Sequence, residues 1–459
     1  MDSTTNKADS HVGLKIKEKV SYGIGDFSSN LVWGLIGSYL LFFYTNVALI
    51  PVAFTGTLFL VARMLDAVID PVIGGFVDRT DTKLGRTLPY IRYGIIPLAI
   101  IYILTFCYFP GSTLFKVIYA YITYILVGIF YSLVNVPYGS LMTLMTRDSA
   151  EKAQLSSLRV AFAAIGSIFV TGLAMPIVKF FGHGNDRLGF FITAIIFALV
   201  GIVGFEIVSH NCKERYLDDF SEQVQAKHKA SILSTYKNAF RNRAWVTTVL
   251  LSLLLFIRIG VIVAITIYFA NYVLKSPMMI SILLPVLYVG QLLSTLFSSQ
   301  MIAKFGHRKT NIIGNVGMLI SYIFLPFLEH NLVLFTIVYL AGNVIGAVSA
   351  SSVFGMNADS VDYNEWKFGV RSEGTLYAGY SFSTKVGMAI GSALAGYALS
   401  WIHFSPKAIT PSVVSGLNIL FYALPAILTV LMIIVAMFYN LDAKHGQIVK
   451  ELNNLNYKR

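Results

Sequence analysis

Charged residues are scarce in this sequence of 459 residues, since Asp, Glu, Lys and Arg together make up 13% of it. Soluble domains carry about 25% charged residues, so a soluble globular protein is excluded. Hydrophobic residues make up 56%, and the mean hydropathy is +0.68. Residues 95–109 and 419–439 contain no charge at all. Because a helix needs about 20 apolar residues to cross a bilayer, the sequence predicts an all-α membrane protein.

Cysteine is also rare. The two cysteines, Cys107 in an apolar run and Cys212 in a polar segment, offer no plausible disulfide. The motifs GxxxxGK[ST], HExxH and GxSxG are missing, which disfavours an ATP-driven pump and a membrane protease. We therefore expect no enzymatic activity and no cofactor. All histidines fall in predicted loops or at helix ends, which argues against a histidine proton relay inside the bilayer.

The positive charges are unevenly placed. The net charge of +12 does not indicate nucleic-acid binding, because most Lys and Arg residues gather in alternate loops. The other loops hold only Lys116, Lys179, Arg187, Lys275 and Lys407. This asymmetry predicts that both termini lie in the cytoplasm.

The apolar runs predict about twelve transmembrane helices in two six-helix bundles. The N-terminal bundle is expected at 21–209 and the C-terminal bundle at 244–439. The basic segment 210–243 would be a central cytoplasmic loop, flanked by cytoplasmic ends at 1–20 and 440–459. The loops GGFVDRTDTKLGRTLP (74–89) and AKFGHRKT (303–310) repeat a glycine beside basic residues in matching places. No loop is long enough for an output domain, which disfavours a membrane sensor or receptor.

Several charged residues fall inside predicted helices. An ionised residue near the bilayer centre costs about 2.5–3.5 kcal/mol or more, so each is a functional candidate. The set comprises Asp26, Arg63, Asp66, Asp70, Arg159, Arg258 and Lys385.

Asp66 and Asp70 are the sharpest feature, because the i, i+4 spacing places both carboxylates on one helix face. Two carboxylates this close favour binding a proton or a metal cation between them. The alternative is a structural salt-bridge network that joins this helix to Lys385 or Arg258. For Asp26 and Arg258 a structural role is favoured. Arg159, Asn30 and Asn135 offer groups suited to sugar hydroxyls, although buried asparagines also tie helices together.

Five segments together resemble the glycoside–pentoside–hexuronide:cation symporters, the melibiose-carrier type of the major facilitator superfamily. They are SYGIGDFSSN (21–30), YTNV (44–47), LVARMLDAVIDPVIGGFVDRTDTKLGRTLPY (60–90), YSLVNVPYGSL (131–141) and ADSVDYNEWKFGVRSEGTLYAGYSFSTKVG (358–387). The resemblance covers nearly the whole chain. It implies alternating access around one central cavity that holds cation and sugar side by side.

The resemblance also implies roles for individual residues. Asp66, Asp70, Ser132 and Lys385 would form the cation site, and the two aspartates would be the metal ligands if the cation is Na⁺. Substrate would contact Asn30, Tyr131, Asn135 and Arg159. A network of charges would stabilise and close the carrier; its members are Asp26, Arg63, Arg258, Asp359, Asp362, Glu365 and Arg371.

Differences from the melibiose carriers narrow the expected cation and the expected sugar. Ile69 stands where they have an asparagine between the aspartates, and the lost oxygen favours H⁺ over Na⁺. Asn30 and Asn135 replace sugar-binding aspartates, and Gly139 replaces a tryptophan, so α-galactosides are not the expected substrates. YSLVNVPYGSL is closer to the glucuronide and xyloside carriers.

A surplus of intramembrane cations over carboxylates would also suit an anionic sugar. The sequence thus predicts a proton-coupled importer of a glucuronide or a pentoside such as a xyloside. It would work as a monomer in the bilayer of a bacterial inner membrane. Na⁺ coupling and a lipid-like or peptide-like solute remain alternatives, because fold does not fix function.

Overall fold

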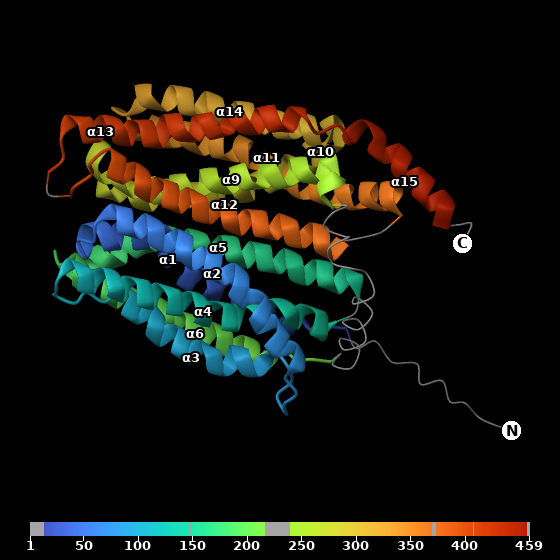
Figure 1. Cartoon of the computed structure of the whole chain (residues 1–459), viewed down its shortest axis with the longest axis horizontal. Helices are drawn as coiled ribbons and strands as arrows, with labels where there is room; N and C mark the ends of the chain where they lie inside the picture. Colours follow the sequence, from blue (N-terminus) through green and yellow to red (C-terminus); the bar gives the residue numbers. More distant parts are fainter. Residues whose placement is uncertain (1–12, 147, 216–238, 370–372, 407, 457–459) are drawn as a thin grey trace.

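The computed structural model describes residues 13–146, 148–215, 239–369, 373–406 and 408–456. Within these residues every named secondary-structure element is a helix, as predicted. The first half contains α1 to α6, and the second half contains α9 to α15 (Figure 1). Figure 1 places the start of α1 and helix α15 on the same side of the molecule, which we call the terminal end; the other side is the far end.

The first half contains six helices, the number expected for one bundle. They are α1 Ile16–Phe42, α2 Val52–Arg79, α3 Leu88–Thr105, α4 Thr113–Met145, α5 Ser149–Gly182 and α6 Asp186–Asn211. A helix rises about 1.5 Å per residue. The 28 residues of α2 are therefore long enough to cross a bilayer despite their charges.

The second half repeats this pattern with one added helix, α15, and its last span consists of α13 and α14 joined by a π-helical turn. Its helices are α9 Arg243–Tyr268, α10 Ile280–Phe324, α11 Leu332–Phe368, α12 Glu373–Trp401, α13 Pro411–Asn418, α14 Leu424–Met437 and α15 Asp442–Asn456. Helix α10 consists of two helices joined across a break at Gly306, where φ is 78° and ψ is 170°. In the described part of the chain, nine helices are long and apolar enough to cross a membrane, counting the joined pair once. Helix α15 was not predicted and lies in the expected tail.

The two halves share their turns at the far end. Both α1 and α9 end in a π-helical turn, Phe43–Val47 and Phe269–Val273. Two residues after each turn comes a non-glycine residue with positive φ, Leu49 at 59° and Lys275 at 51°. A proline follows two residues later in both cases. Such strained backbone at matching places indicates a duplicated fold.

The halves also share a turn at the terminal end. Gly85 has φ 108° and Gly306 has φ 78°, conformations that favour glycine. Glu214, just after α6, accepts hydrogen bonds from the N–H groups of Arg86, Thr87 and Leu88 at 2.7–3.0 Å. In the second half, Asp442 accepts from the N–H of Arg308 at 2.7 Å. The predicted repeat of these glycine loops therefore has a structural basis.

Helices pack mainly within each half, and the halves meet through α1–α9, α2–α12 and α5–α10. The hydroxyls of Thr45 and Tyr268 are 2.6 Å apart, and Asn46 donates to Tyr272 at 2.5 Å. The hydroxyls of Thr57 and Tyr397 are 2.8 Å apart. All three contacts lie near the far end, so the halves are held closed there.

Small residues allow α12 to approach α9. A Cβ added at Gly387 would lie 2.6 Å from the carbonyl oxygen of Leu253, and one at Gly391 would lie 2.4 Å from that of Ile257. Side chains at these positions would force the helices apart. The Gly387–Gly391 pair thus serves helix packing.

Candidate functional site

An ion pair links the two halves near the middle of the molecule. Asp66 and Asp70 lie one turn apart on α2, and the ammonium of Lys385 on α12 donates to Asp70 Oδ2 at 2.5 Å. The other oxygen, Asp70 Oδ1, is buried and has no hydrogen-bond partner among the described residues. Burying a charged carboxylate oxygen without a hydrogen-bond partner costs free energy, and binding a proton or a cation at this atom would lower that cost.

The ion pair faces a cavity of about 410 Å³ between α1, α2, α4 and α12. Asp66, Asp70 and Lys385 line it together with Tyr131, Ser132 and Asn135 of α4. Gly128 makes room for Asp66, because a Cβ at this position would lie 2.9 Å from Asp66 Oδ1. The cavity therefore combines charged groups with the hydroxyl and amide groups of α4.

Trp33 is a lining residue that the sequence analysis missed. Its ring lies on that of Tyr131, with the centroids 4.4 Å apart and the planes tilted by 31°. Trp33 also lines a second cavity of about 220 Å³, which reaches between the halves to α9 and α10. The sequence places Trp33 one helical turn after Ser29, but only the structure shows that Ser29 contacts Tyr131 at 2.7 Å.

The two asparagines lie in different cavities. Asn135 lines the larger cavity and accepts from Ser29 at 3.4 Å. Asn30 lines the smaller one, where it accepts from Ser167 of α5 at 3.0 Å and donates to the carbonyl oxygen of Asp26 at 2.8 Å. Asn30 is thus positioned by helix contacts while its side chain still borders a cavity.

Arg159 and Asp26 form an ion pair inside the first half. The guanidinium binds both carboxylate oxygens, the second at 3.3 Å. Tyr138 donates to the same carboxylate at 3.1 Å, and its ring centroid lies 5.0 Å from the guanidinium carbon. Neither charge lines the two central cavities described above. The structural role expected for Asp26 extends to Arg159, and sugar contact by Arg159 stays a prediction.

Arg258 occupies a different environment in the second half. Its residue is 5% exposed, and it donates to Thr429 at 3.0 Å and to Asn315 at 3.3 Å. Asn315 in turn donates to Asn311. No carboxylate among the described residues forms an ion pair with Arg258. One alternative from the sequence was a salt bridge between Arg258 and the aspartates of α2, and the structure does not show this contact.

A cluster of acidic residues and histidines lies at the terminal end. His445 of α15 lies 3.0 Å from Asp362 and 3.6 Å from Asp359, and His307 lies 3.5 Å from Asp359. Asp359 and Asp362, predicted to close the carrier, thus connect α11 to α10 and α15. Glu365 lies one turn further along α11. Arg371 and the side chain of Arg63 lie outside the described residues.

The chain matches known transporters over almost its full length. The family described as MFS/sugar transport protein matches residues 21–443. The isoprimeverose transporter of Lactiplantibacillus pentosus is 33% identical over 95% of this chain and 91% of its own. The putative glycoside/cation symporter YagG of Escherichia coli (strain K12) is 32% identical over 96% and 95%.

Solved structures agree on the fold. A bacterial homologue of the lysosomal transporter Spinster, crystallised in an inward-facing and unoccupied conformation, superposes with a TM-score of 0.70. It covers 94% of this chain and 98% of its own, at 13% sequence identity. The chain is a multi-pass membrane transporter and not an enzyme, and it belongs to the MFS/sugar transport family.

Proposed function

We propose that this protein is a proton-coupled symporter that imports a glycoside by alternating access. The observation that carries the proposal is the Asp70–Lys385 ion pair, which joins the two halves beside a cavity that also exposes hydroxyl and amide groups. One oxygen of Asp70 has no hydrogen-bond partner among the described residues. A cation that binds there therefore acts directly on a link between the moving parts.

A proton on Asp70 would remove the negative charge that holds Lys385. The contact between α2 and α12 would weaken, and the repulsion between Asp70 and Asp66 would fall. Protonation would therefore change both the net charge of the cavity and the distance between α2 and α12 before sugar binds there. Coupling arises because each ligand changes the free energy of binding of the other.

The ligand set favours H⁺ over Na⁺. A proton needs one carboxylate, whereas Na⁺ needs several oxygen ligands in a shell. Ile69, between the two aspartates, supplies none, although Ser132 could add one hydroxyl. Na⁺ coupling through Asp66 and Asp70 is the alternative.

The cavity lining favours a neutral sugar. Among the described residues, the charged ones that line it are Asp66, Asp70 and Lys385. Arg258, one of the intramembrane cations counted in the sequence, contacts Thr429 and Asn315 elsewhere. Hydroxyl and amide groups of Tyr131, Ser132 and Asn135 would bind sugar hydroxyls, and the Trp33 ring would cover an apolar sugar face. We therefore favour a pentoside such as a xyloside over a glucuronide as the substrate. The relative named as an isoprimeverose transporter supports this order.

We further propose that the terminal end faces the cytoplasm of a bacterial cell, following the distribution of Lys and Arg. The closed contacts at the far end then make this an inward-facing conformation. A lipid-like solute is the weaker alternative, because it would form few hydrogen bonds with the polar groups of α4.

The direct test is sugar-triggered proton uptake by de-energised cells that express the chain. The panel contains a β-xyloside, isoprimeverose, a glucuronide, a β-glucoside and melibiose, each with and without Na⁺. We expect the medium to become alkaline after a pentoside without Na⁺, and cells carrying Asp70→Asn to give no signal. Sugar entry that needs Na⁺ and moves no protons would replace H⁺ by Na⁺ in the proposal. Entry of none of these sugars would refute a glycoside substrate.

A further inference from the structure

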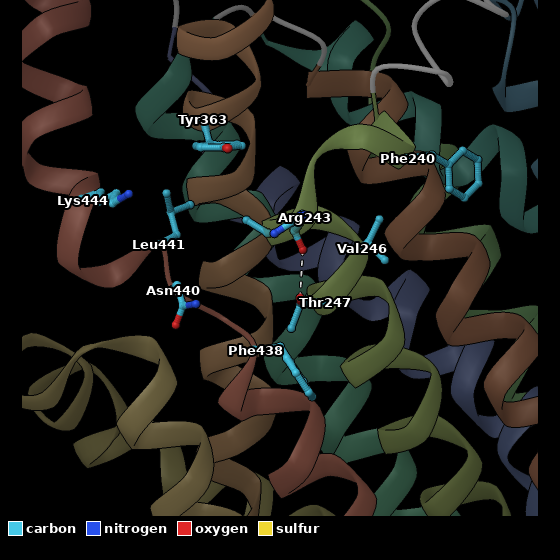
Figure 2. Close-up of a pocket in the computed structure, with 10 residues that line it drawn as sticks. Phe240, Arg243, Val246, Thr247, Tyr363, Phe438, Asn440, Leu441 and Lys444 are labelled. Atoms are coloured by element: carbon cyan, nitrogen blue, oxygen red, sulfur yellow. Dashed lines mark hydrogen bonds between the residues drawn. The ribbon is translucent and has the colours of Figure 1, made fainter.

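A second large cavity lies at the terminal end of the second half, away from the transport cavity. It measures about 530 Å³ and is bordered by the start of α9, the end of α14, the start of α15 and Tyr363 of α11 (Figure 2). Figure 2 shows Lys444 and Arg243 on opposite sides, with Tyr363 above and Phe438 below. The transport proposal assigns no role to this cavity.

The cavity lies where apolar helices give way to polar chain. Helix α14 is apolar along its length and is followed by Phe438, whereas α15 carries charged residues from Asp442 onward. Phe438 and Phe240 line the cavity, and each is 70% exposed. In a membrane-embedded chain, exposed aromatic side chains at such a boundary face lipid. One wall of the cavity is thus open to the bilayer.

The cations of the cavity lack acidic partners. Neither Arg243 nor Lys444 forms an ion pair within the described part of the chain, and both are exposed. The carboxylates nearby are held elsewhere, and each has a defined contact: Asp442 with the N–H of Arg308 at 2.7 Å, Asp362 with His445 at 3.0 Å and Glu451 with Trp366 at 2.7 Å. The described lining of the cavity therefore carries two cations and no carboxylate.

We propose that this cavity binds the headgroup of an anionic phospholipid. Arg243 and Lys444 contact the phosphate from opposite sides, and an acyl chain runs along Phe438. Basic pockets between helices at a membrane surface bind acidic headgroups in this way. The bound lipid would join α9 to α15, the helix that carries His445 and Asp442. The inference requires only that the chain is embedded in a membrane and does not depend on the transported solute.

The test measures lipid binding to the purified full-length chain in detergent by native mass spectrometry. The probes are palmitoyl-oleoyl phosphatidylglycerol, the matching phosphatidylcholine and soluble glycerol phosphate. Arg243→Gln/Lys444→Gln removes both cations of the cavity. The matched control is Arg241→Gln/Lys450→Gln, which removes two exposed cations that do not line it.

A basic residue near a membrane surface contributes about 1 kcal/mol, so each substitution should weaken phosphatidylglycerol binding about fivefold. We expect a loss of roughly 25-fold in the cavity variant, little change in the control, and weak binding of phosphatidylcholine. An equal loss in the control would overturn the proposal, since the attraction would be diffuse. Equal binding of both lipids by the unmodified chain would also overturn it, and needs no variant. So would glycerol phosphate binding that depends on Arg243 and Lys444 as strongly as lipid binding does.

Discussion

The two halves of this transporter have the same turns but different charges. Leu49 and Lys275 occupy matching strained positions, and Gly85 and Gly306 occupy matching turns. In contrast, α2 carries Asp66 and Asp70, while the corresponding part of α10 has no charged residue before Lys304. Backbone geometry has been preserved between the halves, whereas the charged chemistry lies mainly on one of them.

Buried arginines show the same contrast. Arg159 in the first half is neutralised by Asp26, whereas Arg258 in the second half is bound by Thr429 and Asn315. Among the residues that the structure describes, the second half contributes Lys385 to the cavity but no carboxylate. Under the proposed function, the first half would bind the coupling cation and the second half would supply the charge that responds to it.

The largest effect is expected from neutralising the acidic pair. Asp70→Asn or Asp66→Asn should lower sugar accumulation more than tenfold, because the proton has no carboxylate to bind. Downhill sugar flux should persist. Arg258→Gln, the corresponding neutralisation in the second half, should leave accumulation largely intact. Uptake of radiolabelled sugar by energised cells measures all three, and full accumulation in Asp70→Asn would contradict the assignment.

The buried arginines should differ in their effect on stability. Arg159→Met leaves the carboxylate of Asp26 buried without its partner, which should lower the free energy of unfolding by about 3–5 kcal/mol. Arg258→Met leaves no carboxylate behind, so a loss of only about 1 kcal/mol is expected. Thermal unfolding in detergent compares the two. Adding Asp26→Leu to Arg159→Met should recover much of the lost stability. Equal losses of stability in Arg159→Met and Arg258→Met would contradict the difference proposed between the two arginines.

The matched glycine turns should respond alike. Gly85→Ala and Gly306→Ala force a side chain into backbone conformations that favour glycine, at a cost of about 1–3 kcal/mol each. In both cases the new Cβ would also press on a carboxylate, that of Glu214 or Asp442. Unfolding midpoints should therefore fall by similar amounts. A lower unfolding midpoint in only one of the two variants would show that the glycine turn does not stabilise both halves equally.

The smallest effect concerns Trp33, which touches sugar in our proposal but carries no charge. An aromatic contact contributes about 0.5–1.5 kcal/mol beyond buried area, so Trp33→Leu should raise KM by roughly tenfold at most. The proton-to-sugar ratio should stay unchanged. Trp33→Phe keeps a ring and serves as the control. A change in the ratio with unaltered KM would place Trp33 in coupling instead of sugar binding.

The helices and the acidic pair could be predicted because both follow from local sequence. Apolar runs define the spans, and the i, i+4 spacing of Asp66 and Asp70 fixes their common face. The Arg159–Asp26 pair and the Trp33–Tyr131 contact join residues more than ninety positions apart, so helix spacing alone does not reveal them. Helix α15 was missed because it is too short and polar to resemble a span, although Ile448 on it is buried.

The measurement that tests the account most directly is proton uptake per sugar by proteoliposomes containing Asp70→Asn/Lys385→Gln. If Asp70 merely neutralises Lys385, removing both charges should restore coupling. If Asp70 carries the proton, the double variant should admit sugar down its gradient without any proton. We predict the second result. Proton-coupled accumulation by the double variant, at the ratio of the unmodified chain, would contradict the account.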